Sequence, residues 1–325
     1  MEATSVFISG SSGYIGSHFT KFFAKKGLRV FGLDRVASPP AVQSYLQDFL
    51  HTDLKNETLV KTFVKKHGIH HVIHCAALCL VGESVEKPDL YEENNVKSSD
   101  IFLRALLSCG LQSFIFSSTA ATYGEPKFSP ITEDHPQNPI NPYGQTKLDF
   151  EKILIQSSQE NGFSWGIMRY FNAAGADPEG ELGENHDPET HLIPNACKAV
   201  LEMGPTLKIF GNDYQTRDGT CERDYIHVMD LADAHYRLLT SIQKGKQGGA
   251  YNLGLGVGYT VNEVVQEIER QTDKVVPKVY ADRRPGDPSK LVASNAKAKN
   301  ELGWTLNYSD LPTLVKTTLS WFKFI

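Results

Sequence analysis

Tyr143 and Lys147 are the two residues whose types and spacing most directly suggest chemistry. Asn141 suits a helix N-cap and Pro142 suits the first helical position, so Tyr143 and Lys147 should lie at i and i+4 on one helix face. A free tyrosine titrates at about pH 10 and is a poor base at neutrality. A nearby ammonium stabilises the phenolate and lowers that pKa. A Tyr-x-x-x-Lys pair alone is more often a plain helix surface, so its meaning depends on its surroundings.

A run that ends in hydroxyl side chains precedes this pair. Residues 114–118 read as an apolar strand that ends in Ser117 and Ser118, and Thr119 follows. Strand ends face the ligand crevice in open α/β sheets. We therefore expect a hydroxyl of Ser118 or Thr119 to complete a proton relay with Tyr143. For Ser117, a simple serine-rich turn is a serious alternative.

The first apolar run, 5–9, leads into a glycine-rich turn with the spacing G-x-x-G-x-x-G. Glycine permits a tight turn and lets the backbone approach a pyrophosphate, while the following helix directs N–H groups at the anion. Three glycines alone are weak support, but their position between a strand and a helix strengthens it. The residues predicted to hold the phosphates are Gly10, Gly13, Tyr14, Ile15 and Gly16.

Asp34 follows the second apolar run, 18 residues after Gly16. A carboxylate there accepts hydrogen bonds from an adenosine ribose and repels a 2′-phosphate, which favours NAD over NADP. Arg35 is adjacent and argues the other way, and Asp34 could also be a loop cap. We give more weight to Asp34 because of its place at a strand end. The cationic nicotinamide of NAD would further lower the pKa of Tyr143.

Short apolar runs alternate with helical patterns in the first half of the chain. They are apolar throughout, which is typical of parallel strands covered by helices on both faces. Repeated strand–helix–strand units predict an α/β fold with a doubly wound, Rossmann-type parallel sheet. The predicted elements are strands at 5–9, 28–33, 71–76, 113–118 and 164–170 and a helix over about 14–26.

The pattern changes after about residue 172, where 177–188 is rich in Gly, Pro, Asp and Glu. We predict an NAD-binding domain over 1–172 and a smaller C-terminal α/β lobe over 173–325 that mainly binds the substrate. Segment 228–254 is expected to return to the first domain.

Composition excludes several classes of function. The net charge of −5 provides no basic field for nucleic acid or an anionic membrane. We find no run long enough to span a bilayer and no signal-peptide pattern, so we expect a soluble, cytoplasmic protein. Five cysteines, an odd number without metal-clip spacing, predict reduced thiols and no metal site.

Beyond these residues, the chain closely resembles the UDP-glucose 4-epimerases, which are extended short-chain dehydrogenases/reductases. The resemblance covers nearly the whole chain, and its later motifs occur in fewer protein families than the glycine turn does. The matching stretches are GSSGYIGSH from Gly10, VIHCAALCLVGES from Val72, FIFSSTAATYG from Phe114, NPYGQTK from Asn141, MRYFNAAGA from Met168, HLIP from His191, IFGNDY from Ile209, RDYIHVMDLADAH from Arg223, YNLG from Tyr251 and RRPGDP from Arg283.

The resemblance implies further roles for individual residues. Asp53 and Leu54 would contact the adenine, and Tyr170 would pack near the nicotinamide. The cofactor would also be lined by Ala76, Ala77, Leu78, Asn95, Ser117, Tyr143 and Lys147. The residues expected to contact the UDP-sugar are Thr119, Tyr143, Asn172, His191, Leu192, Arg223, Arg284, Asp287 and Leu291. Arginine suits this task because its forked donors match diphosphate oxygens.

Two positions depart from the pattern of many members. Cys79 stands where they carry a lysine that reaches the cofactor, so NAD is expected to be held less tightly. Leu291 stands where they carry a tyrosine bordering the sugar, which puts the choice of sugar in doubt. The resemblance also implies a homodimer that pairs helices around 91–107 and 143–156.

The expected activity is reversible, NAD-dependent epimerisation at C4 of UDP-glucose and UDP-galactose through a 4-keto sugar. UDP-N-acetylglucosamine or a UDP-pentose remains an alternative substrate. A nucleotide-sugar dehydratase is disfavoured because Ala120 and Ala121 occupy the place of the acidic groups it needs. A non-catalytic NAD-binding regulator would have no need of the Tyr143/Lys147 pair.

Overall fold

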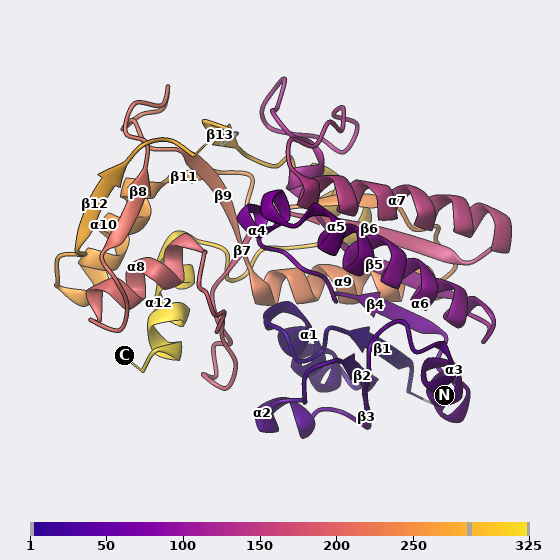
Figure 1. The fold of residues 1–325 in the computed structure, drawn as a ribbon. Helices are drawn as coiled ribbons and strands as arrows, with labels where there is room; N and C mark the ends of the chain where they lie inside the picture. Colours follow the sequence, from indigo (N-terminus) through magenta and orange to yellow (C-terminus); the bar gives the residue numbers. More distant parts are fainter. Residues whose placement is uncertain (1–2, 285–287, 324–325) are drawn as a thin grey trace.

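The computed structural model describes residues 3–284 and 288–323. Its central feature is a seven-stranded parallel sheet with the order β10-β6-β5-β4-β1-β2-β3 (Figure 1). This order, with crossovers in both directions from β1, confirms the predicted doubly wound α/β fold. The strands are β1 (Ser5–Ser9), β2 (Arg29–Asp34), β3 (Asp48–His51), β4 (His71–His74), β5 (Ser113–Thr119), β6 (Ser164–Tyr170) and β10 (Ala250–Leu253).

Helices pack on both faces of this sheet, which explains why its strands are apolar throughout. In β1, Val6 and Ile8 belong to the core under α1 and α9, whereas Phe7 belongs to the core under α3, α6 and α7. None of the helices in the described part of the chain is both long and apolar enough to cross a bilayer. The helices of this region are α1 (Tyr14–Lys25), α2 (Pro40–Gln43), α3 (Glu57–His67), α4 (Val81–Glu86), α5 (Pro88–Tyr91), the π-helix η1 (Glu92–Lys97), α6 (Ser98–Leu107), the 3₁₀-helix η2 (Ala120–Thr122), α7 (Pro142–Asn161), α9 (Val228–Gln243) and α11 (Ala296–Leu302).

A second, smaller core lies beside the sheet, in the left part of Figure 1. Strand β9 pairs with β11, β13 and β7, and β12 pairs with β8. Helix α10 begins with a capping box between Thr260 and Glu263, which satisfies its first N–H groups. The elements of this lobe are β7 (Asn172–Ala174), α8 (Leu192–Val200), β8 (Leu207–Phe210), β9 (Glu222–His227), β11 (Gly258–Thr260), α10 (Val261–Thr272), β12 (Lys278–Ala281), β13 (Lys290–Leu291) and α12 (Leu311–Trp321).

The chain passes between the two cores several times. Helix α9 shares the core of α1, and β10 joins β6 at the edge of the large sheet, with Tyr251 opposite Met168. The sequence did not point to a later return, in which Ala298 of α11 and Trp304 also enter the large core. The division at residue 172 remains our proposal, with segment 228–254 and these two residues belonging to the first part.

The glycine turn between β1 and α1 has little room for side chains. A Cβ at Gly16 would lie 2.1 Å from the carbonyl oxygen of Gly10. We predict that Gly16→Ala lowers the free energy of unfolding by about 1–3 kcal/mol, since the backbone must shift to accept the methyl group. Chemical denaturation followed by circular dichroism measures this change.

Gly82→Ala is the matched control, because Gly82 also lies in a helix but a Cβ there would meet no atom of the described structure within 4 Å. This variant should be neutral or slightly more stable, since alanine has the higher helix propensity. Equal stability of the two variants would contradict a steric requirement at Gly16.

Candidate active site

The glycine turn has a geometry that suits a bound pyrophosphate. Gly10 has φ of +74°, which glycine adopts readily, and a Cβ there would lie 2.6 Å from the backbone nitrogen of Ala76. Gly13 is the N-cap of α1 and has no side chain to occupy the N–H groups of the first turn. Those groups and the helix dipole therefore favour an anion at this point. Tyr14 and Ile15 begin the helix as expected, so the turn fits the diphosphate of a dinucleotide.

Asp34 is the last residue of β2 and lies beside this turn. Its Oδ2 accepts a hydrogen bond from the backbone N–H of Ser12 at 3.0 Å, and its Oδ1 accepts one from the N–H of Val36 at 3.1 Å. The carboxylate is thereby held next to the glycine turn, with lone pairs remaining for a ribose. Arg35 is exposed, and its guanidinium donates to Asn94 at 3.5 Å.

The loop after β4 is fixed by Asn95. The Oδ1 atom of Asn95 accepts from Leu78 N–H at 2.8 Å, and its Nδ2 donates to Leu78 O at 3.0 Å and to the Thr146 hydroxyl at 3.2 Å. Asn95 is buried, so it positions the segment of Ala76 and Ala77 against α7. The two residues expected to contact the adenine differ in exposure. Asp53 is exposed, whereas the side chain of Leu54 is buried in the core.

Tyr143 and Lys147 lie on the first turns of α7, as the spacing predicts. Asn141 caps this helix, since its Oδ1 accepts from Gly144 N–H at 2.8 Å. Lys147 is buried and donates to the carbonyl oxygen of Ser117 at 2.9 Å, with its Nζ 6.0 Å from the centre of the Tyr143 ring. A Cβ on Gly144 would lie 2.5 Å from Ala121 O, so α7 closely approaches the segment that follows Thr119.

Burial shifts the pKa values of Tyr143 and Lys147 in opposite directions. The pKa of Tyr143 is raised above its ordinary value, mainly by burial, while a hydrogen bond with Thr119 opposes the shift. Burial lowers the pKa of Lys147 to about 8, against the influence of Cys79 and Cys75. Without a cofactor the phenol therefore keeps its proton. An added positive charge beside the ring is what would make Tyr143 a base near neutrality.

The hydroxyls at the end of β5 have different partners. The Thr119 hydroxyl is close enough to Tyr143 to oppose the rise of the Tyr143 pKa, and it also accepts a hydrogen bond from Ala121 N–H at 3.1 Å. Ser117 lies 2.8 Å from the Tyr170 hydroxyl. Ser118, which the sequence offered as an alternative relay, instead donates to buried Glu151 at 2.5 Å. The structure thus gives Ser118 a structural partner, which leaves Thr119 as the hydroxyl expected to act with Tyr143.

Sequence reasoning missed the group that holds Ser118. Glu151 binds Arg169 through two hydrogen bonds of 3.0 and 2.7 Å, and both side chains are buried. Arg169 also donates to the Tyr123 hydroxyl at 2.9 Å, which donates to Asn252 at 2.6 Å. The available signal was that Glu151 lies four residues after Lys147 on the same helix face.

Tyr170 also has partners that the sequence did not reveal. Its hydroxyl lies 2.7 Å from Nε2 of buried His235, in addition to its contact with Ser117. Burial lowers the pKa of His235 to about 3, so this imidazole is neutral. The chain from Ser117 through Tyr170 to His235 orders the end of β6.

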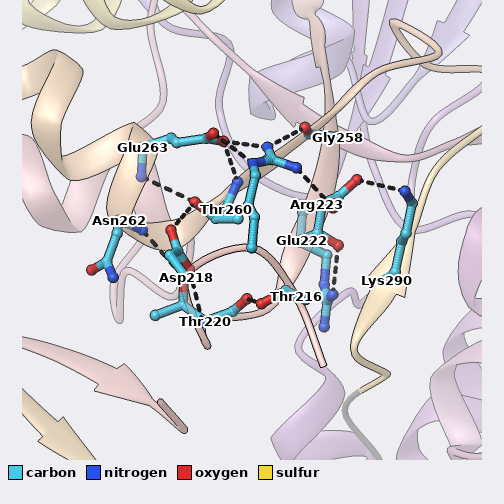
Figure 2. A network of polar contacts seen from close by, with 11 residues as sticks. Thr216, Asp218, Thr220, Glu222, Arg223, Gly258, Thr260, Asn262, Glu263 and Lys290 are labelled. Atoms are coloured by element: carbon cyan, nitrogen blue, oxygen red, sulfur yellow. Dashed lines mark hydrogen bonds and ion pairs between the residues drawn. The ribbon is translucent and has the colours of Figure 1, made fainter. Parts of the chain in front are cut away.

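Three of the residues expected to bind the substrate, Arg223, Leu291 and Asn172, lie on β9 or on strands paired with it. Arg223 is opposite Leu291 of β13 in the strand register, and it donates to the backbone oxygen of Glu222 at 2.8 Å. The Glu222 carboxylate is bound by Lys290 at 3.0 Å and by Arg217 at 2.9 Å (Figure 2). Lys290 and Arg217 thus balance the negative charge of the Glu222 carboxylate.

Further predicted substrate residues flank this strand. Asn172 donates to Asp224 O at 2.8 Å, and the exposed Arg284 stacks its guanidinium 3.9 Å from the Phe210 ring centre. His191 caps α8, which begins at Leu192. Asp287 lies outside the described residues.

Leu291 belongs to a small buried group at the junction of the two cores. It packs against the cluster that contains Ala120, Tyr123 and Phe171. Ala120 follows Thr119 and Phe171 follows Tyr170, so Leu291 lies near the ends of β5 and β6.

We predict that Glu151→Gln lowers the free energy of unfolding by about 3–5 kcal/mol, because it leaves the Arg169 charge buried without its carboxylate. The matched control is Asp100→Asn, which breaks an ion pair with Arg104, whose side chain is 74% exposed. The control should change stability by less than about 1 kcal/mol. Similar losses in both variants, measured by urea denaturation, would argue against a special role of the buried pair.

Comparisons with known proteins agree with this architecture. Residues 6–254 match the profile of the NAD dependent epimerase/dehydratase family. The chain is 45% identical over 318 residues to UDP-glucose 4-epimerase of Halalkalibacterium halodurans, covering 98% of this chain and 95% of the relative. It is also similar to the crystal structure of UDP-glucose 4-epimerase from Brucella ovis in complex with NAD, with a TM-score of 0.95, 43% identity and 98% of each chain covered.

A third similar structure is the UDP-Glc/GlcNAc 4-epimerase of Campylobacter jejuni, with a TM-score of 0.86, 36% identity and 99% of each chain covered. The family match spans most of the chain, and the similarities extend over almost its full length. The chain therefore belongs to the NAD-dependent epimerase/dehydratase family.

Proposed function

We propose that the chain catalyses the reversible, NAD-dependent interconversion of UDP-glucose and UDP-galactose by inversion at C4. The observation that carries the proposal is the placement of Tyr143 and the buried Lys147 on successive turns of α7, beside the end of β5 and at the carboxyl edge of a sheet whose glycine turn suits a dinucleotide. The relatives with full-length similarity are UDP-glucose 4-epimerases.

The protein groups divide the proton transfer between them. Thr119 orients the sugar hydroxyl, and Tyr143 as phenolate accepts its proton and later returns it. Lys147 keeps its ammonium beside the ring and contacts the nicotinamide ribose. The chemistry that NAD supplies when bound is reversible hydride exchange with C4. The 4-keto sugar turns about its pyrophosphate link, so that both of its faces reach the same site.

Such a turn requires the UDP part to be held away from the reacting carbon. Arg223 and Arg284 provide guanidinium groups for the diphosphate, and Asn172, His191 and Leu192 complete this side. Asp34 selects NAD at the other end of the crevice. The lack of a lysine at Cys79 weakens cofactor retention. A homodimer through helices around 91–107 and 143–156 and a cytoplasmic location stay predictions.

Tyr143→Phe should reduce the turnover of UDP-galactose by about 10²–10⁴-fold, because it removes the acid–base hydroxyl. The measurement is kcat with no added NAD, together with chromatography of the nucleotide released on denaturation. The variant should still release NAD(H), and little NADP(H) should be found in either protein.

The matched control is Tyr280→Phe, a half-exposed tyrosine whose hydroxyl contacts Asn262. It should retain the wild-type rate. A Tyr143→Phe variant that turns over UDP-galactose as fast as this control would refute the assigned base.

Leu291 supports a second substrate, UDP-N-acetylglucosamine. Its position beside Ala120 and Phe171 places a branched aliphatic group where a tyrosine ring would take more room. The Campylobacter jejuni relative is named as an epimerase of both UDP-glucose and its N-acetylated counterpart. We infer that the space around C2 of the sugar accommodates an N-acetyl group.

Leu291→Tyr should depress kcat/KM for UDP-N-acetylglucosamine by about 10- to 100-fold relative to UDP-glucose, since the larger side chain overpacks the site. Leu291→Met nearly conserves volume and should keep the wild-type ratio between the two sugars. A wild type inert toward the N-acetylated sugar, or a tyrosine variant that slows both sugars equally, contradicts the inference.

A further inference from the structure

The loop between β7 and α8 contains four potential metal ligands with the spacing E-x-H-x-x-E-x-H. They are Glu184, His186, Glu189 and His191. One carboxylate oxygen or imidazole nitrogen from each of them lies within 4.8 Å of all the others. The spacing of the cysteines in the sequence does not reveal such a cluster.

Both imidazoles approach the same carboxylate. The Nδ1 atom of His186 lies 2.9 Å from Glu184 Oε1, and His191 makes an even shorter contact with this oxygen through its own Nδ1. The same two nitrogens lie 3.9 and 3.8 Å from Glu189 Oε1. Two nitrogen and two oxygen ligands therefore surround one small volume.

The carboxylates of this group are buried, whereas one imidazole reaches solvent. The side chains of Glu184 and Glu189 are 3% and 5% exposed, and that of His191 is 45% exposed. Two carboxylates in such a place require compensating positive charge. His191 provides a path by which an ion enters from solvent.

Two polar atoms of the cluster lack hydrogen bonds. Among the described residues, neither Glu189 Oε2 nor His186 Nδ1 has a partner with hydrogen-bond geometry. Lys198 Nζ lies 4.0 Å from Glu189 Oε2, which is too long for a hydrogen bond. The other oxygen, Oε1, already accepts from the N–H groups of Thr190 and His191 at 2.8 and 2.9 Å. A buried carboxylate oxygen without a donor is costly, and a cation would satisfy it.

We propose that Glu184, His186, Glu189 and His191 bind one divalent transition-metal ion, with zinc as the expected occupant. Imidazole nitrogen and carboxylate oxygen are ligands that zinc accepts in tetrahedral sites. Bonds of the usual zinc length place neighbouring ligand atoms roughly 3.3 Å apart. The distances between the imidazole nitrogens and the carboxylate oxygens run from the short His191–Glu184 contact to 3.9 Å, and all four ligand atoms lie within 4.8 Å of one another, so they lie on both sides of this value.

The ion would serve structure, because four protein ligands leave no open position for a substrate. His186 packs edge-on to the ring of Tyr14, with ring centres 6.2 Å apart, and Glu184 accepts a hydrogen bond through its backbone oxygen from Trp321 at 3.0 Å. The ion would thus fix the loop that touches both the start of α1 and the end of α12. The proposal shares His191 with the proposed UDP-binding side, but its test measures the ion itself and changes the other ligands, so it is judged separately from the epimerase activity.

The experiment uses untagged full-length protein, treated with a chelator, incubated with zinc sulfate and passed through a desalting column. Metal analysis should find about one zinc ion per chain, and zinc should raise the melting temperature. His186→Asn and Glu189→Gln should each lose stoichiometric zinc and the thermal shift, with affinity lowered at least about 10-fold. Their retained NAD(H) and their melting temperatures without zinc report that the variants fold.

Two control variants separate this cluster from adventitious zinc. His70→Asn removes a histidine outside the cluster, and Cys79→Ser removes an exposed thiol, so both should keep one zinc ion per chain. Cobalt(II) in the wild type should give the visible absorption bands of tetrahedral coordination, and His186→Asn should not. No retained zinc in the wild type, or zinc retained by both cluster variants, overturns the proposal.

Discussion

The packing of α7 against the end of β5 is the contact on which the active site depends. Three positions on successive turns of the helix make it: Gly144 against Ala121, Lys147 on the Ser117 carbonyl and Glu151 on Ser118. Each interaction requires a particular residue type, since the first needs the absence of a side chain, the second a long cation and the third an anion. Because they span two turns, they fix the rotation of the helix and so direct Tyr143 toward Thr119.

The same packing accounts for the electrostatics of the site. Burying the Lys147 ammonium lowers its pKa to about 8, and burying the Tyr143 phenol raises the pKa of that group. Low dielectric makes both groups sensitive to a nearby charge. A cationic cofactor would shift the phenol toward its anion. In the proposed mechanism, Tyr143 would thus keep its proton until the cofactor is bound.

A second set of contacts holds the segment that follows β7 to the large sheet. Lys21 of α1 is buried and forms ion pairs with Asp177, Glu179 and Glu181 at 2.5, 2.8 and 3.1 Å. The Tyr14 hydroxyl donates to the backbone oxygen of Gly175 at 2.6 Å. The helix that begins at the phosphate-binding turn is therefore also the helix that holds the loop toward α8. The glycine turn and the loop toward α8 thus share one helix.

Local sequence features were sufficient to predict most strands of the large sheet, the helix that follows the glycine turn and the placement of Tyr143 and Lys147 on one helix face. Apolar runs of strand length, the glycine turn, the Asn141 cap and the i, i+4 spacing of Tyr143 and Lys147 all express short-range sterics and hydrogen bonding, which act wherever the segment lies. Other features depended on tertiary structure: Ser118 turns to Glu151 instead of to Tyr143, Trp304 returns to the first core, and the two histidines of the β7–α8 loop meet two buried carboxylates. These contacts join residues whose proximity follows from the packing of whole elements, and no local pattern encodes which partner a buried polar group will find.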